Sequence, residues 1–512
     1  MDWTPLALGL CVLSALLGAV QPIYNLYFHP LRYFPGPRLA VVTRWYRIYY
    51  DVILKGAWLP HLELLHAKYG AIVRIGPNEL HFSSPCAYAT IYANGSPFTK
   101  ESTLYRSFGM EEGSFAIVDP HKSRKRREML LPLFSRRAIL KLESVIQEKV
   151  NLMISGIIAH GSNPVDLSLA FRCTTFDTIA DYCFGQSFNA LGAPNFQHPL
   201  LIKMQSSIQY FWILRHFPFI LPLAAAIPRC IAERCSPLYR EFDVVREQVE
   251  AVVDRFFMMN NSDGFNLDRA MDAERETVFH HLIRPKSEST CASKGSGTPS
   301  RKALLDEALV LLQAGSDTVG HTCILGTFHA LSDGEVLAKL VGELKEAWPD
   351  KDTHVGYAML EKLPYLTAFI KESLRVSHGV ITPLARVVPE ATCIAGLNIP
   401  AGTIVSTGST FMHNDPNVFS DPMRFNPDRW LKSEDGNIRE LESQFVPFSR
   451  GPRMCLGFNL AWCEMYLIFA NLFRKLDLNL YQTTKEDFKF KEVFVPVRLG
   501  RHLRAVGSER TS

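Results

Sequence analysis

The sequence predicts a mainly α fold with a minor β part. Two long runs, 302–331 and 460–476, keep apolar residues at helical spacing and contain no proline that would break a helix. The β-prone runs are much shorter. Residues 71–75 and 79–82 are two of them, and the Gly-Pro-Asn sequence at 76–78 predicts a hairpin between them. Long helices with a few short strands are therefore the expected architecture.

The composition is that of a globular protein. Of the 512 residues, 47% are hydrophobic and 21% are charged, and the net charge of +4 gives the whole molecule no general attraction to nucleic acids. The length allows about three ordinary domains or one large helical enzyme. Eleven cysteines follow no regular spacing, and the odd number argues against a disulfide framework and for a reducing compartment.

Residues 1–28 are predicted to be an N-terminal membrane anchor. The run from Leu6 to Val20 is uncharged, and about 20 apolar residues are enough to span a bilayer. Asp2 is the only charged residue before this run, whereas several arginines follow it. The positive-inside rule therefore keeps the bulk of the chain in the cytosol. A cleaved signal peptide is the alternative, but it would prefer a basic start.

A proline-rich hinge, residues 29–40, follows the anchor. It contains Pro30, Pro35 and Pro37. Because proline fixes φ, the hinge is expected to hold the remaining body, residues 41–512, at a set angle to the membrane.

Residues 121–127 form a dense basic run, and Arg136 and Arg137 follow it. Such a run is typical of a nucleic-acid patch. No aromatic residues are interleaved with it, and an anchored protein would not meet DNA, so we predict no nucleic-acid partner. From the residues alone, a solvated basic helix face is the alternative.

The helix predicted over 302–331 carries an unusual centre. Gly315 in mid-helix costs about 1 kcal/mol relative to Ala, and a flat cofactor pressed against the helix would explain it. Thr318 can bond back to a helix carbonyl and open a gap for water. Asp317 lies next to it, so this position could relay protons. Further on, Glu372 and Arg375 share one face of a helix that begins near residue 366.

The stretch 448–457 has the clearest chemical signal. Its order, F-x-x-G-x-R-x-C-x-G, is made by Phe448, Gly451, Arg453, Cys455 and Gly457. Each residue has a task if Cys455 binds a haem iron. The glycines allow tight turns and close approach to a flat ligand. Arg453 suits an anionic haem carboxylate, and Phe448 would shield the sulfur. The helix that follows points its positive end toward the thiolate. A buried structural cysteine is the alternative.

This stretch resembles the cysteine-ligand loop of the cytochrome P-450 family, the haem-thiolate monooxygenases. The resemblance covers nearly the whole chain, and the sequence of residues 69–83 is close to that of filamentous-fungal members. A proline-rich hinge behind an anchor is what microsomal members show. The resemblance thus implies the cytochrome P-450 fold with one N-terminal transmembrane helix in the endoplasmic reticulum membrane, and a haem-thiolate catalytic domain, residues 41–512, that faces the cytosol.

The resemblance also implies roles for individual residues. Asp317 and Thr318 match the acid–alcohol pair that delivers protons for O–O cleavage. Glu372 and Arg375, with Arg429 as third partner, match a structural charge network that fixes the loop carrying Cys455. Removing one member of this network should destabilise the folded protein by several kcal/mol.

Further positions follow from the same resemblance. Arg127 and Arg386 match contacts to the haem propionates, with Arg124 as a rival to Arg127 because the usual Trp is replaced by Ser123. Residues 210–227 are either a buried core segment or a lid that dips into the membrane. The β-prone run 403–405 is expected to pair with 394–399.

The implied activity is insertion of one oxygen atom from O₂ into a lipophilic small molecule. The cofactor would be haem b, whose thiolate ligand favours O–O cleavage. Electrons would come from NADPH through a membrane-bound reductase, with cytochrome b5 as a further partner in some members. The similarity to filamentous-fungal members favours a role in secondary metabolism, such as a terpenoid pathway. The alternatives are a haem-thiolate isomerase or dehydratase that needs no reductase, and a non-catalytic haem sensor.

Overall fold

The computed structural model describes residues 20–511 apart from four gaps, which are 228–236, 262–276, 284–298 and 432–437. The protein is mainly helical, as predicted. The helices are α2 (Arg38–Val42), α3 (Trp45–Ile48), α4 (Trp58–Tyr69), α5 (Pro85–Ile91), α6 (Ser102–Arg106), α7 (Pro120–Leu130), α8 (Arg136–Ala159), α9 (Leu167–Phe184), α10 (Pro199–Ser207), α11 (Phe211–His216), α12 (Ile220–Ala226), α14 (Pro237–Asn261), α16 (Val278–Ile283), α17 (Arg301–Ser332), α18 (Gly334–Ala347), α19 (Tyr357–Leu360), α20 (Pro364–Ser377), α21 (Ser409–His413), α22 (Ile438–Gln444) and α23 (Phe458–Lys475).

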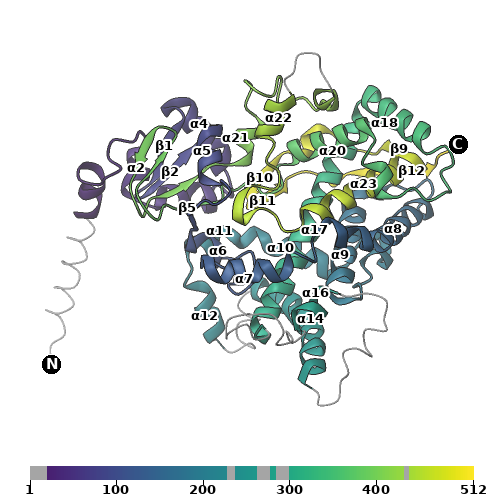
Figure 1. Cartoon of the computed structure of the whole chain (residues 1–512), viewed down its shortest axis with the longest axis horizontal. Coiled ribbons are helices and arrows are strands. Elements are labelled where there is room, and N and C mark those ends of the chain that lie inside the picture. The colour runs from purple at the N-terminus through teal and green to yellow at the C-terminus, as the bar shows by residue number, and fades with distance from the viewer. Residues whose placement is uncertain (1–19, 228–236, 262–276, 284–298, 432–437, 512) are drawn as a thin grey trace.

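The strands are short and form four small sheets. They are β1 (Ile72–Gly76), β2 (Glu79–Phe82), β3 (Thr99–Lys100), β4 (Val165–Asp166), β5 (Arg386–Val387), β6 (Thr392–Ile394), β7 (Leu397–Ile399), β8 (Ile404–Ser406), β9 (Leu476–Leu480), β10 (Phe490–Val493), β11 (Val495–Arg498) and β12 (Arg504–Glu509). The largest sheet has the order β1-β2-β8-β5-β3, and the others are β4-β12-β9, β6-β7 and β10-β11. In Figure 1 the five-stranded sheet lies at one end of the molecule and α8, α18 and α23 lie toward the other.

The predicted hairpin between β1 and β2 is confirmed, because Ile72 pairs with Phe82 in an antiparallel register. The predicted pairing of 403–405 with 394–399 is wrong. Instead, β8 pairs with β2 and β5, and β6 and β7 pair with each other. Residues 395–396 form a tight turn with positive φ, so the chain folds back locally before it can reach β8.

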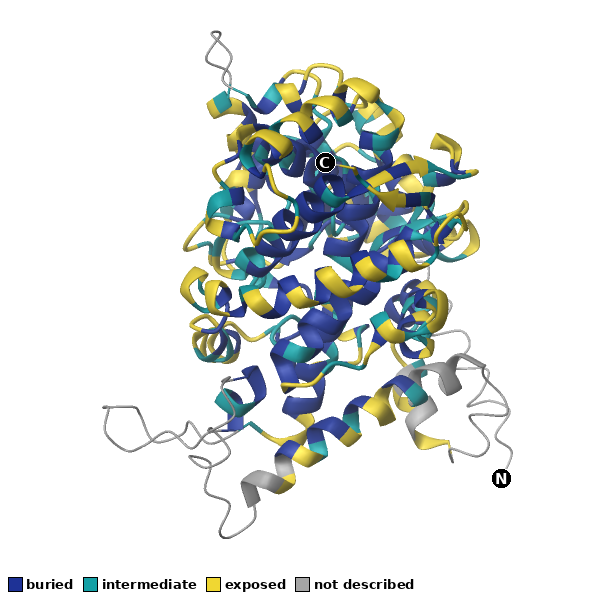
Figure 2. Ribbon diagram, turned by 90° about the vertical axis from the view of Figure 1, so that its right-hand side faces the viewer, coloured by how far each residue is buried: buried dark blue, intermediate teal, exposed yellow. Residues whose placement is uncertain are grey.

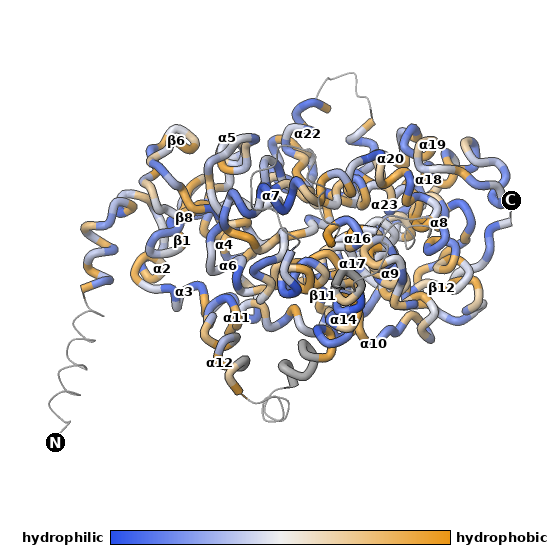
Figure 3. Tube along the Cα trace, turned by 60° about the horizontal axis from the view of Figure 1, so that its bottom comes forward, coloured by the Kyte–Doolittle hydropathy of each residue, from blue (hydrophilic) through white to orange (hydrophobic). Residues whose placement is uncertain are grey.

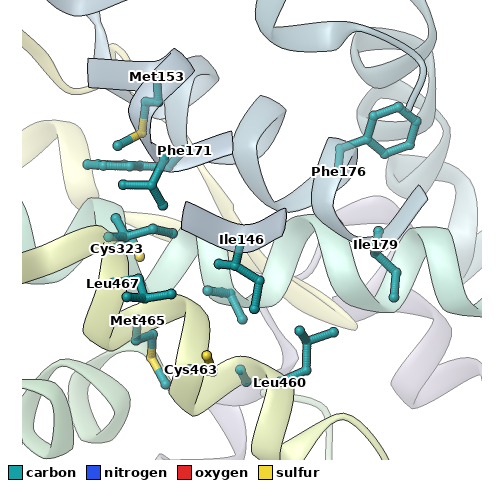
Figure 4. Packing of buried hydrophobic residues seen from close by; sticks show 14 of the residues in the cluster. Ile146, Met153, Phe171, Phe176, Ile179, Cys323, Leu460, Cys463, Met465 and Leu467 are labelled. Carbon is teal, nitrogen blue, oxygen red and sulfur yellow. The ribbon is translucent and has the colours of Figure 1, made fainter. Parts of the chain in front are cut away.

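The main core is the packing of α8, α9, α17 and α23. Figure 4 shows side chains of this cluster, including Phe171, Cys323 and Leu467, which are fully or almost fully buried. Exposed residues lie on the outer faces of the helices (Figure 2). Close packing on several sides fixes α17 in the centre, where its two ends are defined by polar groups. Ser300 accepts a hydrogen bond from the N–H of Ala303, which caps the first turn.

The hinge and the end of the predicted anchor are both bonded to the five-stranded sheet. The buried guanidinium of Arg74 donates to the carbonyl of Asn25, and the N–H of Arg74 donates to the carbonyl of Pro35 at 2.7 Å. A Cβ on Gly36 would lie 2.2 Å from the carbonyl oxygen of Arg74, so only glycine fits. Most of the predicted anchor, residues 1–19, lies outside the described residues. Among the described residues, no helix is long and apolar enough to cross a membrane.

Candidate functional site

Cys455 lies in a loop that its own backbone organises. The N–H of Cys455 donates to the carbonyl of Phe448 at 2.9 Å, and the 3₁₀ turn Gly451–Arg453 lies between them. Helix α23 begins at Phe458, three residues after the cysteine. Cys455 itself is an exposed residue. The predicted placement of Cys455 at a helix N-terminus is therefore what the structure contains.

Opposing influences act on the thiol. Burial raises the pKa of Cys455, whereas the N–H of Gly457 and the positive charge of Arg127 act in the other direction. An N–H aimed at sulfur is the arrangement expected for a thiolate ligand. Gly457 has no protein atom within 4 Å of the place where a Cβ would lie, so a flat group could approach there.

Gly451 has a different reason to be glycine than the one predicted. Its φ is +74°, which confirms the tight turn. The close neighbours, however, are the carbonyl oxygens of Ala93 and Tyr92, at 2.5 and 2.6 Å from a Cβ built there. The residue therefore fits the loop against the end of α5 rather than against a flat ligand.

Arginines gather around a cavity of about 480 Å³ beside this loop. The cavity is lined by Arg124, Arg127, Arg386, Arg450 and Arg453, with Glu128 as the one acid among them. Nη1 of Arg453 is buried without a hydrogen-bond partner. Burial and the charge of Arg386 lower the pKa of Arg453 to about 10. Such crowding of buried cations suits the binding of an anionic group.

Arg127 is better placed than its rival Arg124. Both line the cavity, but only the charge of Arg127 acts on the thiol of Cys455. Arg386 is buried and donates to the hydroxyl of Tyr105 at 2.6 Å and to two backbone carbonyls. The structure thus brings Arg127, Arg386 and Arg453 together, as the resemblance implied.

Lys100 completes this group of cations and was not predicted. Burial, followed by the charges of Arg386, Arg453 and Arg127, lowers the pKa of Lys100 well below its usual value. Its ammonium donates to the carbonyl of Phe115. Among the residues that the structure describes, no carboxylate pairs with any of these four cations. We call Lys100, Arg127, Arg386 and Arg453 the cation group. It fits the two carboxylates of an iron porphyrin whose metal would be bound by Cys455.

The acid and the alcohol lie together on α17. Thr318 Oγ1 donates to the carbonyl of Ala314 at 3.0 Å, which confirms the predicted bond back to the helix. The carboxylate of Asp317 forms an ion pair with Arg172 of α9, with 3.1 Å between Oδ1 and Nε. Both Asp317 and Thr318 line a small cavity of about 60 Å³. This partner of the acid could not be predicted, because Arg172 is 145 positions earlier in the chain.

The structure gives a reason for Gly315 that was not predicted. A Cβ at this position would lie 2.8 Å from Cγ1 of Ile179, a residue of α9. Glycine is needed here because α17 and α9 cross closely. Ile179 and the crossing are visible in Figure 4.

The predicted charge network is present, with Glu372 and Arg375 fully buried and Arg429 partly buried. Arg375 donates to both oxygens of Glu372 at 2.7 and 2.9 Å, and Arg429 Nε lies 3.2 Å from Oε1 of Glu372. Arg375 also donates to the carbonyls of His413, Pro422 and Arg424. His413 in turn accepts from the N–H of Val446, close to the cysteine loop. The network therefore joins α20 to the segment that leads to Cys455.

Phenylalanine rings form a second feature that the sequence did not reveal. Rings of Phe108, Phe115, Phe211 and Phe494 lie with centroids 4.7–5.8 Å apart. They come from four separate segments. Phe494 has φ of +66°, which is uncommon for an aromatic residue, and its carbonyl accepts from the N–H groups of Ile381 and Thr382. The four rings pack together in a small apolar core in which Phe211 and Phe494 are buried.

Comparison with known proteins agrees with this geometry. The family model described as Cytochrome P-450 matches residues 45–502. The chain is 34% identical to tryptophan 6-hydroxylase fscE of Fusarium equiseti over 92% of its length and 90% of the relative's. It is 33% identical to N-acetyltryptophan 6-hydroxylase ivoC of Emericella nidulans over 94% of both chains. It is 34% identical to the cytochrome P-450 monooxygenase TRI4 of Trichoderma arundinaceum over 94% of its length and 91% of the relative's.

The match extends from the first helices of the body to the C-terminal sheet, and it includes Cys455 in its loop. The relatives are monooxygenases, which removes the isomerase and the sensor as classes for this chain. With its mainly helical fold, its cysteine loop and its oxygenase relatives, the chain belongs to the cytochrome P-450 family of haem-dependent monooxygenases.

Proposed function

We propose that this protein hydroxylates a lipophilic small molecule in fungal secondary metabolism. The observation that carries the proposal is the juxtaposition of Cys455 with the cation group. Cys455 would supply the axial sulfur to haem b, and the cations would bind its carboxylates. When bound, the haem supplies the chemistry that activates O₂. The remaining steps, which are binding, orientation and proton supply, belong to the residues of this chain.

The proton supply is assigned to Thr318 and Asp317. Thr318 holds its hydroxyl on the open side of α17, and Asp317 lies next to it in an ion pair with Arg172. A hydroxyl and a carboxylate at hydrogen-bonding range of one small cavity can pass a proton inward through water.

The substrate class is supported by the phenylalanine cluster and by the relatives. The four packed rings would offer apolar contacts to a lipophilic molecule bound next to them. The names of two relatives specify tryptophan or N-acetyltryptophan as their substrates. A terpenoid or an indole-derived skeleton therefore suits this chain, with oxidation beyond hydroxylation as an extension of the same activity.

We also propose the cellular setting. Residues 1–28 would anchor the chain in the endoplasmic reticulum membrane, residues 29–40 would act as the hinge, and residues 41–512 would form the catalytic domain on the cytosolic side. NADPH electrons would arrive through a reductase that docks on the basic face of α7, whose hydrophilic character is visible in Figure 3, with cytochrome b5 as a second donor.

The decisive experiment uses the full chain and the carbon monoxide difference spectrum of the reduced protein. The parent should show the long-wavelength Soret band of a thiolate–CO complex, and Cys455→Ser should lose it. Cys393→Ser changes an exposed cysteine of β6 and should keep the band. A parent protein that binds no iron, or binds it through nitrogen, would end the proposal. Reductase, NADPH and O₂ consumption with lipophilic candidates then test the oxygenation.

A further inference from the structure

The small cavity beside Thr318 is bordered by two arginines. It lies where α9, α10, α17 and β11 meet the C-terminal segment. Arg172, Asp317, Thr318, His321, Arg498 and His502 contribute to its lining. Its volume of about 60 Å³ corresponds to roughly two water molecules, which is also the space that a carboxylate group needs.

Both guanidinium groups are incompletely bonded. Nη1 of Arg172 and Nη1 of Arg498 are buried and have no hydrogen-bond partner. Nε of Arg172 lies 3.1 Å from Asp317, and Nη2 of Arg498 donates to Ser168 Oγ at 2.9 Å. Each of the two arginines therefore has one nitrogen, Nη1, whose N–H groups have no acceptor, and buried donors of this kind require one.

The cavity also carries an excess of positive charge. Asp317 neutralises Arg172, but within the described part of the chain no carboxylate forms an ion pair with Arg498. The acids whose charge reaches Arg498 are engaged elsewhere, since Asp166 contacts His502 and Asp487 contacts Arg501. Burial and the charge of Arg172 lower the pKa of Arg498 to about 9. His321 is held neutral by burial and by the same two arginines, which lower its pKa.

The excess positive charge on the Arg172 and Arg498 side of the cavity attracts an anion. Two planar guanidinium groups with free N–H donors are the usual partners of a carboxylate. We propose that this cavity, which we call the Arg172–Arg498 pocket, binds the carboxylate of an acidic, otherwise lipophilic substrate. The inference rests on the proposed function and narrows its substrate class to lipophilic acids.

The test is an equilibrium titration of the haem-loaded full chain, followed by the substrate-induced shift of its Soret band. The probes are dodecanoate, 4-phenylbutyrate and indole-3-propionate, each paired with its methyl ester. At least one acid should bind the parent protein about tenfold or more tightly than its ester, because a charge-assisted bond is lost in the ester. Arg498→Gln should remove this preference by weakening the acid and leaving the ester unchanged.

Two further variants keep the result interpretable. Arg504→Gln removes an exposed arginine of β12 and should retain the acid preference of the parent. Arg498→Lys keeps the charge and should retain part of it. The carbon monoxide band is recorded first for every variant, so loss of haem–thiolate binding, which would count against the proposed function, is separated from loss of acid binding.

Two outcomes would overturn the pocket assignment while the monooxygenase assignment stands. One is equal affinity of the acids and their esters for a parent protein with a normal carbon monoxide band. The other is an acid preference that Arg498→Gln leaves undiminished. In either case the cavity is filled by water and the unpaired N–H groups donate to that water.

Discussion

At the scale of single residues, the proposed haem site combines a cysteine with cations from distant parts of the chain. Cys455 and Arg453 could be placed by their shared motif, and in the structure Arg453 lines a cavity together with Arg127, whose charge acts on Cys455. Lys100 could not, because nothing in its surroundings signals that an ammonium group will be buried. Arg172 escaped for a similar reason, since an ion pair between distant positions leaves no local pattern. Buried charges of this kind become visible only when the fold brings their partners together.

Thr318→Ala should separate oxygen consumption from product formation. Without the hydroxyl at this position, a proton is no longer held next to the reacting oxygen, so peroxide should escape. A positioned proton donor is worth about 10²–10⁴-fold, and water can replace part of this, so product per NADPH should fall by about tenfold or more. Peroxide and product are measured together with reductase. Thr322→Ala, one turn along α17 and bonded to Ser377, should stay coupled. Undiminished coupling in Thr318→Ala would remove the relay.

Glu492 should make the stability of the protein depend on pH. Its Oε1 accepts from Thr382 at 2.8 Å, Oε2 is buried without a partner, and burial together with Asp51 raises its pKa to about 7. The folded state therefore binds this proton more tightly than the unfolded state. Its favourable contribution is complete below about pH 4.5 and is lost as the pH rises to about 7.

The substitution Glu492→Gln should flatten this dependence. At pH 8 the variant should be more stable than the parent by up to about 3 kcal/mol, the equivalent of the pKa displacement. Midpoints of denaturant unfolding between pH 5 and 8 measure the effect. Glu486→Gln changes an exposed carboxylate of the neighbouring turn and should follow the parent. If the two glutamine variants show the same pH slope, Glu492 is ionised in the folded protein.

At the scale of elements, long helices were predictable and short strands were not. The prediction for 302–331 differs from α17 by one residue at each end, because a continuous apolar pattern without proline defines a helix well. β6, β7 and β8 have three residues each, and their partners are decided by the turn at 395–396 and by the sheet that receives β8. A glycine within a helix indicates that another group approaches the helix closely, but the sequence does not tell which group it is or on which side of the helix it lies.

The close crossing of α17 and α9 at Gly315 can be tested by substitution. Gly315→Ala should destabilise the protein by about 1–3 kcal/mol, because the added methyl group would meet Ile179 at 2.8 Å. The double variant with Ile179→Ala should recover part of this loss, since it removes the atoms that clash. Thermal unfolding of the apo and haem-loaded forms measures both.

Gly342→Ala is the matched control in exposed helix α18. No atom lies within 4 Å of its Cβ position, so the substitution should stabilise the protein by about 0.5–1 kcal/mol through helix propensity alone. Opposite signs at the two glycines are the expected result. A stabilising Gly315→Ala would show that the helices are farther apart than the structure indicates.

At the scale of the whole molecule, apolar side chains are exposed on one connected part of the surface. Trp45, Tyr49 and Phe219 are 65%, 49% and 62% exposed, and the ring of Trp45 lies 6.2 Å from that of Phe217. Figure 3 shows α3, α11 and α12 close together at this edge. The segment 210–227 thus divides in two. α11 packs inside with Phe211 buried, as a core segment would, whereas Phe219 and Leu223 in the part around α12 are exposed.

We expect this surface to lie in the membrane interface together with the proposed anchor. Tryptophan favours that region, and Trp45 is placed to enter it. In vesicles with brominated lipids, fluorescence of the full chain should be quenched through Trp3 and Trp45, and Trp45→Phe should reduce the quenched part by roughly half. Trp348→Phe removes a ring that is 2% exposed and should leave the quenched part unchanged. Equal quenching in the parent and in Trp45→Phe would mean that the body stands away from the bilayer, and lipophilic substrates would then have to enter from water.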